Sequence, residues 1–302
     1  MEEMLKGHFV FGWKVIVYLF LAGIGGGAAA VGAAFHLIHP EADVVSWAAV
    51  VLGFPLVLIG CLLLFTDLGR PGVAFRAISR PHKAWISRGS VILTIFILLG
   101  VIYFGFGIWP FQWLEEAPSF HGVLNVLYGI FGALTVIYTG FLFDTTRSIP
   151  FWSTPILPLL FLVSGVSTGV FSLILSLLLA GTSSSPWIGA LGQFDAFVLL
   201  FEALILFFYL HGMHEVTAAR ASVRRVVRGD LSVPFWVGIV LIGLAVPFLL
   251  EIIWGGEPFA MALASLCGLA GGFYVRYVVV SGAVKAPLNA EGVLIYMSPR
   301  PE

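Results

Sequence analysis

The chain has 302 residues, of which 60% are hydrophobic and 10% are charged, and its formal net charge is −1. Its mean hydropathy is +1.04. Soluble globular proteins carry about 25% charged and about 45–50% apolar residues, so this composition excludes an ordinary soluble domain, a disordered chain and a nucleic-acid binder. It predicts a polytopic membrane protein, and the 15% aromatic content suits a chain that crosses lipid interfaces repeatedly.

Eight segments are long and apolar enough to cross a bilayer core about 30 Å thick, which takes about 20 residues of helix. The runs are continuous and do not alternate with polar residues, so they predict helices and not barrel strands. We expect an all-α integral membrane bundle of eight helices, forming a single domain over 1–302 with a polar tail at 281–302. The predicted spans are approximately 13–35, 46–65, 90–106, 123–143, 156–179, 194–210, 233–250 and 259–280.

A weak internal echo joins the first and fifth spans. Residues 21–27 read LAGIGGG and residues 163–169 read VSGVSTG. Two four-helix halves with the same orientation would produce this echo. Small residues at helix contacts would produce it without any repeat, and both interpretations remain open.

The charged residues are distributed unevenly in the predicted topology. Eight spans put both termini on one side, and all fifteen Lys and Arg residues, with Arg276 at the end of the last span, fall on that side. The positive-inside rule then predicts cytoplasmic termini in a cell inner membrane. The same residues are candidates for docking an acidic partner or for binding anionic lipid. The docking candidates are Arg70, Arg76, Arg80, Lys83, Arg88, Arg224, Arg225 and Arg228.

The two cysteines, Cys61 and Cys267, both lie in apolar runs. Two cysteines are too few for a four-cysteine cluster site, and a disulfide framework is implausible. No zinc-binding pattern occurs. Any iron–sulfur chemistry is therefore expected in a partner subunit, and we expect no haem or metal in this chain.

Three stretches resemble the NrfD-like family, the membrane subunits of polysulfide reductase and related molybdenum–iron–sulfur oxidoreductases. They are WKVIVYLFLAG at 13–23, DLGRP at 67–71 followed by WISRG at 85–89, and YTG at 138–140. The resemblance implies an anchor that binds menaquinone or ubiquinone and has no redox centre of its own. It also implies two partners, a ferredoxin-like iron–sulfur subunit and a catalytic oxidoreductase subunit, with the quinone site at the end of the bundle nearest the clusters.

Quinone chemistry needs an apolar slot, donors for two carbonyls and a titratable path to water. Tyr18 and Tyr138 lie just inside the basic side on the first and fourth spans. The resemblance matches Tyr138 to a tyrosine, and it places Tyr18 where a family member has histidine. Lys14 precedes Tyr18 by one turn on the same face, and Asp67 ends the second span. Alternatively, the two tyrosines place their hydroxyls at the lipid headgroups, and Lys14 extends its ammonium group to the same level. Asp67 would then form a structural pair with Arg70.

An acidic residue inside a membrane span costs free energy, so its presence there indicates a functional role. Asp195 and Glu202 are seven residues apart on the sixth span, so they share a face about 10 Å apart along the helix. With Asp144 at the end of the fourth span, they form a predicted proton path. The alternatives are neutral, hydrogen-bonded carboxyls that pack the bundle, and helix-end pairing for Asp144.

Two other functions remain open at this stage. His36 and His121 form the one interspan histidine pair at matching depth, which is the requirement for axial ligands of a b-type haem. The internal echo, together with buried Asp195 and Glu202, would also suit a proton-coupled secondary transporter.

Overall fold

The computed structural model describes residues 12–66, 85–106, 118–144, 149–182, 185–214 and 217–284. All regular structure in these residues is helical, and eight helical stretches are long and apolar enough to span a membrane. The predicted all-α membrane bundle is therefore confirmed. The elements are α1 (Trp13–Ile38), α2 (Asp43–Phe65), α4 (Trp85–Phe106), α5 (Pro118–Asp144), α6 (Ile156–Leu179), α7 (Pro186–His211), η3 (Gly212–His214), α8 (Thr217–Arg228), η4 (Pro234–Ala245), α9 (Val246–Trp254) and α10 (Pro258–Ser281).

Several helices begin before the apolar run that predicted them. The sixth span was expected from 194, but α7 begins at Pro186, with the Ser185 hydroxyl accepting a hydrogen bond from the Trp187 backbone N–H. Proline suits the first helical turn because its missing N–H would have no intrahelical acceptor there. At α7, therefore, the start of the helix is set by a capping serine and a proline and lies eight residues before the apolar run.

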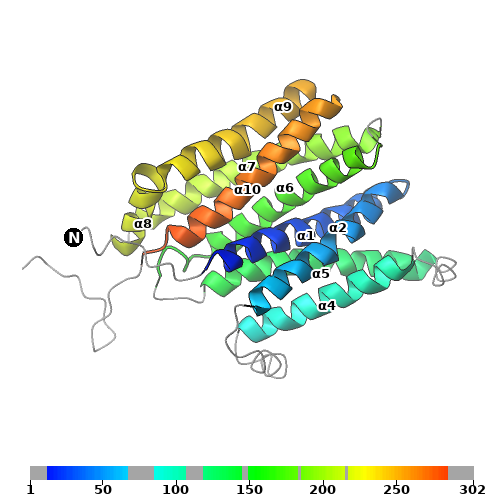
Figure 1. The fold of residues 1–302 in the computed structure, drawn as a ribbon, viewed down its shortest axis with the longest axis horizontal. Coiled ribbons are helices and arrows are strands. Elements are labelled where there is room, and N and C mark those ends of the chain that lie inside the picture. The colour runs from blue at the N-terminus through cyan, green and yellow to red at the C-terminus, as the bar shows by residue number, and fades with distance from the viewer. Residues whose placement is uncertain are drawn as a thin grey trace, which may run out of the picture.

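The eight spans form two groups of four that lie side by side (Figure 1). The first group contains α1, α2, α4 and α5. The second contains α6, α7, α10 and a seventh span made of η4 followed by α9. The helices α1 and α6, which begin the two groups, pack against each other. The spans are thus grouped as two halves, while a repeat relating the halves stays a prediction.

Three consecutive glycines of α1 approach three different helices. A Cβ atom added at Gly25 would lie 2.4 Å from a backbone carbonyl oxygen of α2, and one at Gly26 would lie 2.6 Å from a carbonyl oxygen of α5. At Gly27 the added atom would lie 1.9 Å from the carbonyl oxygen of Gly165 in α6. Each residue turns the helix by about 100°, so α1 is the central helix that α2, α5 and α6 surround. Because Gly27 and Gly165 belong to the two echo segments, the echo also marks a contact between small residues.

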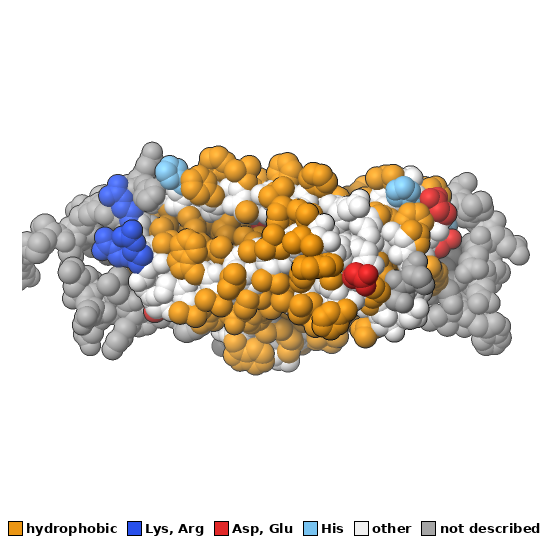
Figure 2. Space-filling view, turned by 90° about the horizontal axis from the view of Figure 1, so that it is seen from above, with side chains coloured by type: hydrophobic (Ala, Val, Ile, Leu, Met, Phe, Trp, Pro, Cys, Tyr) orange, Lys and Arg blue, Asp and Glu red, His pale blue; other side chains and the backbone are white. Residues whose placement is uncertain are grey.

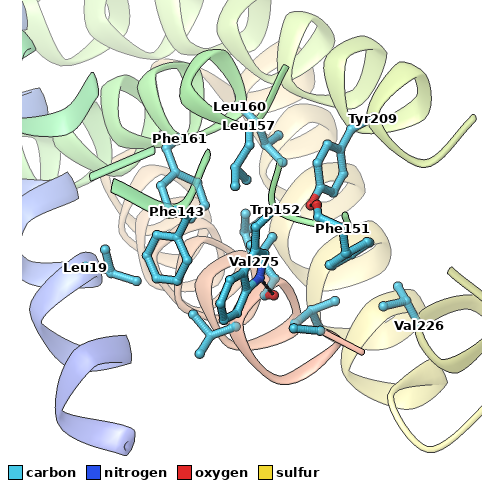
Figure 3. Close-up of a cluster of buried hydrophobic side chains, with 14 of the residues drawn as sticks. Leu19, Phe143, Phe151, Trp152, Leu157, Leu160, Phe161, Tyr209, Val226 and Val275 are labelled. Atoms are coloured by element: carbon cyan, nitrogen blue, oxygen red, sulfur yellow. Dashed lines mark hydrogen bonds between the residues drawn. The ribbon is translucent and has the colours of Figure 1, made fainter. Parts of the chain in front are cut away.

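A short segment between α5 and α6 is buried at one end of the bundle (Figure 3). Phe151 and Trp152 are fully buried there, and the Trp152 indole N–H donates to the Val279 carbonyl oxygen at 2.8 Å. The Tyr209 hydroxyl of α7 donates to the Phe151 carbonyl oxygen at 2.6 Å. The chain between the two halves is thereby bonded to two helices of the second half.

The seventh span departs from α-helical geometry over η4, which is a π-helix of 12 residues. At its end the Val246 backbone N–H bonds to the Leu241 carbonyl oxygen, five residues back. Pro247 follows, and a proline has no N–H and clashes with the carbonyl group four residues before it. The wider turn accommodates this clash and brings Gly243 against Gly271 of α10.

The outer surface has an apolar belt with charged residues at its ends. Figure 2 shows hydrophobic side chains along the bundle, Lys and Arg side chains at one end, and Asp and Glu mainly toward the opposite end. The basic end carries α8 and the start of α1 (Figure 1), and we call it the cationic end. The described exposed acids at the other end are Glu41, Asp43 and Glu257.

We predict that Gly27→Ala destabilises the protein by about 1–3 kcal/mol, because overpacking would push α1 away from α6. The measurement is the midpoint of thermal unfolding of the detergent-solubilised chain. Gly122→Ala in α5 is the matched control, since nothing lies within 4 Å of a Cβ atom added there. Equal midpoints for the two variants would contradict the tight crossing.

Candidate functional site

Tyr18 and Tyr138 come together at the cationic end of the first half. They are 2% and 6% exposed, and they lie close enough to each other and to Cys61 of α2 to interact electrostatically. The ring of Tyr138 lies directly on Gly89 of α4, where an added Cβ atom would be 1.7 Å from Cζ, while Gly60 of α2 lies against the Tyr18 ring. All four helices of the first half therefore contribute to this place.

The other predicted quinone-site residues lie nearby in the fold or outside the described residues. Lys14 is partly buried one turn before Tyr18, and Asp144 is partly buried at the end of α5. Asp67 falls outside the described residues, as do four of the docking candidates, Arg70, Arg76, Arg80 and Lys83.

The predicted acids of α7 belong to a polar network inside the second half. Asp195 is fully buried and accepts a hydrogen bond from the Ser167 hydroxyl at 3.1 Å. Glu202 is 4% exposed and interacts with the hydroxyl of Ser164. Both serines lie on α6, so α6 supplies a polar partner to each acid of α7.

Arg276 corrects one expectation from the sequence. It was placed among the basic residues of the membrane boundary, but it is 1% exposed inside the bundle. Its Nη1 donates to the Ser164 hydroxyl and, at 2.9 Å, to the Gly272 carbonyl oxygen. Its Nη2 lies against Gly23 of α1, where an added Cβ atom would be 2.7 Å away. Arg276 fits inside the bundle because Gly23 and Gly272 have no side chains and leave space for its guanidinium group. Glu202 supplies the opposite charge.

Glu251 is a second buried charged residue, and the apolar pattern of the seventh span did not mark it as a site residue. It lies one turn before the end of α9, is 3% exposed, and interacts electrostatically with Asp195. Neither of its carboxyl oxygens has a hydrogen-bond partner among the described residues. Its side chain points into the bundle because of how α9 is rotated about its axis, and the sequence alone does not specify that rotation.

A small cavity lies beside the network. Its volume is about 10 Å³, and Glu202 of α7, Ser167 and Thr168 of α6, and residues of η4 and α10 line it. A buried water needs a volume of this order and two to four polar partners. The π-helical segment η4 therefore borders a small space beside Glu202.

The described basic residues of the cationic end differ in their surroundings. Arg88 is exposed, with its guanidinium carbon 4.8 Å from the centre of the Trp85 ring. Arg224 and Arg228 are exposed on α8. Arg225 instead makes a two-pronged ion pair with Asp230, at 2.6 Å and 3.1 Å. This hydrogen bonding from Arg225 holds the pKa of the Asp230 carboxyl below its usual value.

The two histidines considered for haem do lie together. The rings of His36 and His121 meet edge to face with centroids 6.1 Å apart, and His36 Nδ1 is 3.6 Å from an oxygen of Asp43. The haem interpretation stays a prediction. Within the ranges that the structure describes, no three His, Cys, Asp or Glu residues gather in a way that could hold a metal ion.

The fold and the buried charges define a multi-pass helical membrane protein with two polar regions inside an apolar bundle. A family model described as polysulphide reductase, NrfD, matches residues 3–286, so the chain belongs to the NrfD family. The resemblance inferred from the sequence is thereby confirmed.

Three relatives illustrate the range of this similarity. A polysulfide reductase chain of Wolinella succinogenes is 31% identical, over 90% of this chain and 93% of its own. Protein NrfD of Escherichia coli is 25% identical, over 93% of this chain and 98% of its own. A selenate reductase subunit of Mesobacillus selenatarsenatis is 26% identical over 49% of this chain and 36% of its own. The first and third of these relatives are thus components of reductase complexes.

We predict that Arg276→Met or Glu202→Gln alone destabilises the protein strongly, by an amount of the order of 3–5 kcal/mol, because each leaves the other group buried without its partner. The double variant should lose much less than the sum of the two. Thermal unfolding midpoints of the four proteins in detergent measure this coupling. Additive losses would show that the two groups do not depend on each other.

Proposed function

We propose that this chain is the quinone-reactive membrane subunit of an oxidoreductase complex. Membership of the NrfD family makes it a membrane anchor of such a complex, with catalytic and electron-transfer partner subunits. The proposal adds that it exchanges electrons between the membrane quinone pool, menaquinone or ubiquinone, and an iron–sulfur partner. The observation that carries the proposal is the meeting of Tyr18 and Tyr138 at the cationic end.

The residues around the two tyrosines suit a quinone head group. Each phenol hydroxyl can donate a hydrogen bond to a carbonyl oxygen, and the surrounding helices are apolar. Lys14, one turn from Tyr18, adds a positive charge that stabilises the negative charge that develops as a quinone takes up electrons. Because both rings are nearly enclosed, a quinone reaches the hydroxyls only when neighbouring side chains move.

The proposed proton path runs through the second half. From the acidic end it follows Glu251, Asp195 and Glu202, with Ser167 bonded to Asp195. Its next groups are Ser164 and Arg276, and Arg276 touches α1 at Gly23, five residues after Tyr18. Asp144 lies at the end of α5 and supplies a separate carboxyl group on the cationic side.

The proposed partner surface is the cationic end. A ferredoxin-like subunit with acidic residues is attracted to exposed cations such as Arg88. The basic residues of 67–84, outside the described ranges, follow α2 and precede α4, so the chain leaves and re-enters the bundle at this end. This assignment makes the cationic end cytoplasmic, by the positive-inside rule.

We predict that Tyr138→Phe lowers quinone-linked turnover of the complex by roughly 10- to 100-fold, since it removes a hydrogen bond to an oxygen that gains charge. Activity of the complex with an artificial dye should be unchanged. Tyr274→Phe in α10 is the matched control, because its ring lies in the second half against Gly238. Unaltered quinone kinetics for Tyr138→Phe would refute the site.

We predict that Asp195→Asn slows quinone-linked turnover about tenfold or more, because a titratable group is lost from the path. The readouts are turnover and proton uptake by the complex in sealed vesicles. Glu257→Gln, which alters an exposed acid at the same end, is the control. Normal turnover with normal proton uptake would reduce Asp195 to a packing role.

A further inference from the structure

An apolar groove opens at the cationic end, away from the two tyrosines. It lies between α7, α8 and η4 and has a volume of about 620 Å³. Its walls include Ala203 and Leu206 of α7 and Phe235, Val240 and Leu244 of η4. A ligand pocket for a small molecule has a volume of about 300–1,000 Å³, so the groove is large enough for more than solvent.

One rim of the groove is lined by arginines of α8. Arg220, Arg224 and Arg228 are spaced four residues apart, so they share one face of the helix. All three are exposed. Val223 and Val227, between them, continue the apolar wall. The groove therefore has a positive rim above an apolar interior.

Arg225, the remaining arginine of α8, fixes the rotation of this helix about its axis. Arg225 bonds to both oxygens of Asp230, and its Nη1 donates to the Ser281 carbonyl oxygen at the end of α10, at 3.3 Å. The buried Val226 packs in the same core as Trp152 (Figure 3). These contacts hold α8 on the bundle with the other three arginines turned toward the groove.

The groove also has the position of a lipid-water boundary. Trp236 lines it, is 51% exposed, and donates its indole N–H to the Val227 carbonyl oxygen at 3.1 Å. Tryptophan concentrates at membrane interfaces. From His211 at the end of α7, the lining continues to Ala203, eight residues or about 12 Å deeper along the helix.

We propose that this groove binds one anionic phospholipid of the leaflet at the cationic end. The arginines of the rim bind its phosphate, since guanidinium groups pair with phosphate oxygens through two parallel hydrogen bonds. One acyl chain lies along the apolar wall. Basic pockets between membrane helices are suited to anionic head groups, whereas an uncharged quinone ring has no need of three cations. Of the two roles that the sequence left open for Arg224 and Arg228, partner docking and lipid binding, this proposal assigns them the second.

The test measures lipid retained by the full-length chain in detergent, by native mass spectrometry, during titration with phosphatidylglycerol or phosphatidylcholine. We expect one phosphatidylglycerol bound with preference over phosphatidylcholine. Arg224→Gln should weaken this binding roughly fivefold, the effect of one cation near an anionic head group. Arg88→Gln, which removes an exposed cation elsewhere at the same end, is the matched control and should leave the binding unchanged.

A second variant tests the apolar part of the groove without altering its charge. Ala203→Phe should fill the wall and reduce phosphatidylglycerol binding, while inorganic phosphate up to millimolar concentration should not displace the lipid. Full binding by Ala203→Phe, or displacement by phosphate, would overturn the proposal in favour of a surface anion site.

Three further results would also overturn the proposal. They are equal binding of the two lipids, equal loss in the two arginine variants, and stoichiometric displacement of phosphatidylglycerol by menaquinone. Unfolding midpoints measured without added lipid identify a variant that fails to fold. In that case Arg224→Lys, which keeps the charge and loses the two-pronged geometry, takes the place of Arg224→Gln and should show weaker binding than the unaltered chain.

Discussion

The close backbone approach along α1 is the constraint on which the remaining structure depends. Gly25, Gly26 and Gly27 bring α2, α5 and α6 within contact of one central helix. Lipid tails are as apolar as leucine side chains, so membrane helices associate through close packing and not through the hydrophobic effect. Three consecutive glycines therefore set how closely these helices approach, and Gly27 sets the distance between the two halves.

Two further glycines make room for charge inside the bundle. Arg276 is enclosed because Gly23 and Gly272 take no space, and its charge is met by Glu202 and the Ser164 hydroxyl. A charged group in an apolar medium is tolerated when it is paired and hydrogen-bonded. Glycines of the spans thus serve both the close packing of the helices and the enclosure of Arg276.

The sequence predicted the number of spans because continuous apolar runs leave few alternatives in a bilayer. It also predicted that Tyr18 and Tyr138 share one end, since both follow from span order. It did not predict the inward direction of Glu251 and Arg276, because their rotation toward the core is set by tertiary contacts. The groove beside α8 was not predicted either, because it forms between α7, α8 and η4, and the distance between these elements cannot be read from any one stretch of sequence.

The buried segment between α5 and α6 has a mechanical consequence. Through Trp152 and Phe151 it is bonded to α10 and α7, while α1 and α6 interlock through their glycines. A transporter whose halves rock about a central substrate must slide such contacts in every cycle. Here that motion would have to separate α1 from α6 at Gly27 and Phe143 of α5 from the Trp152 ring, so we expect the two halves to move as one block.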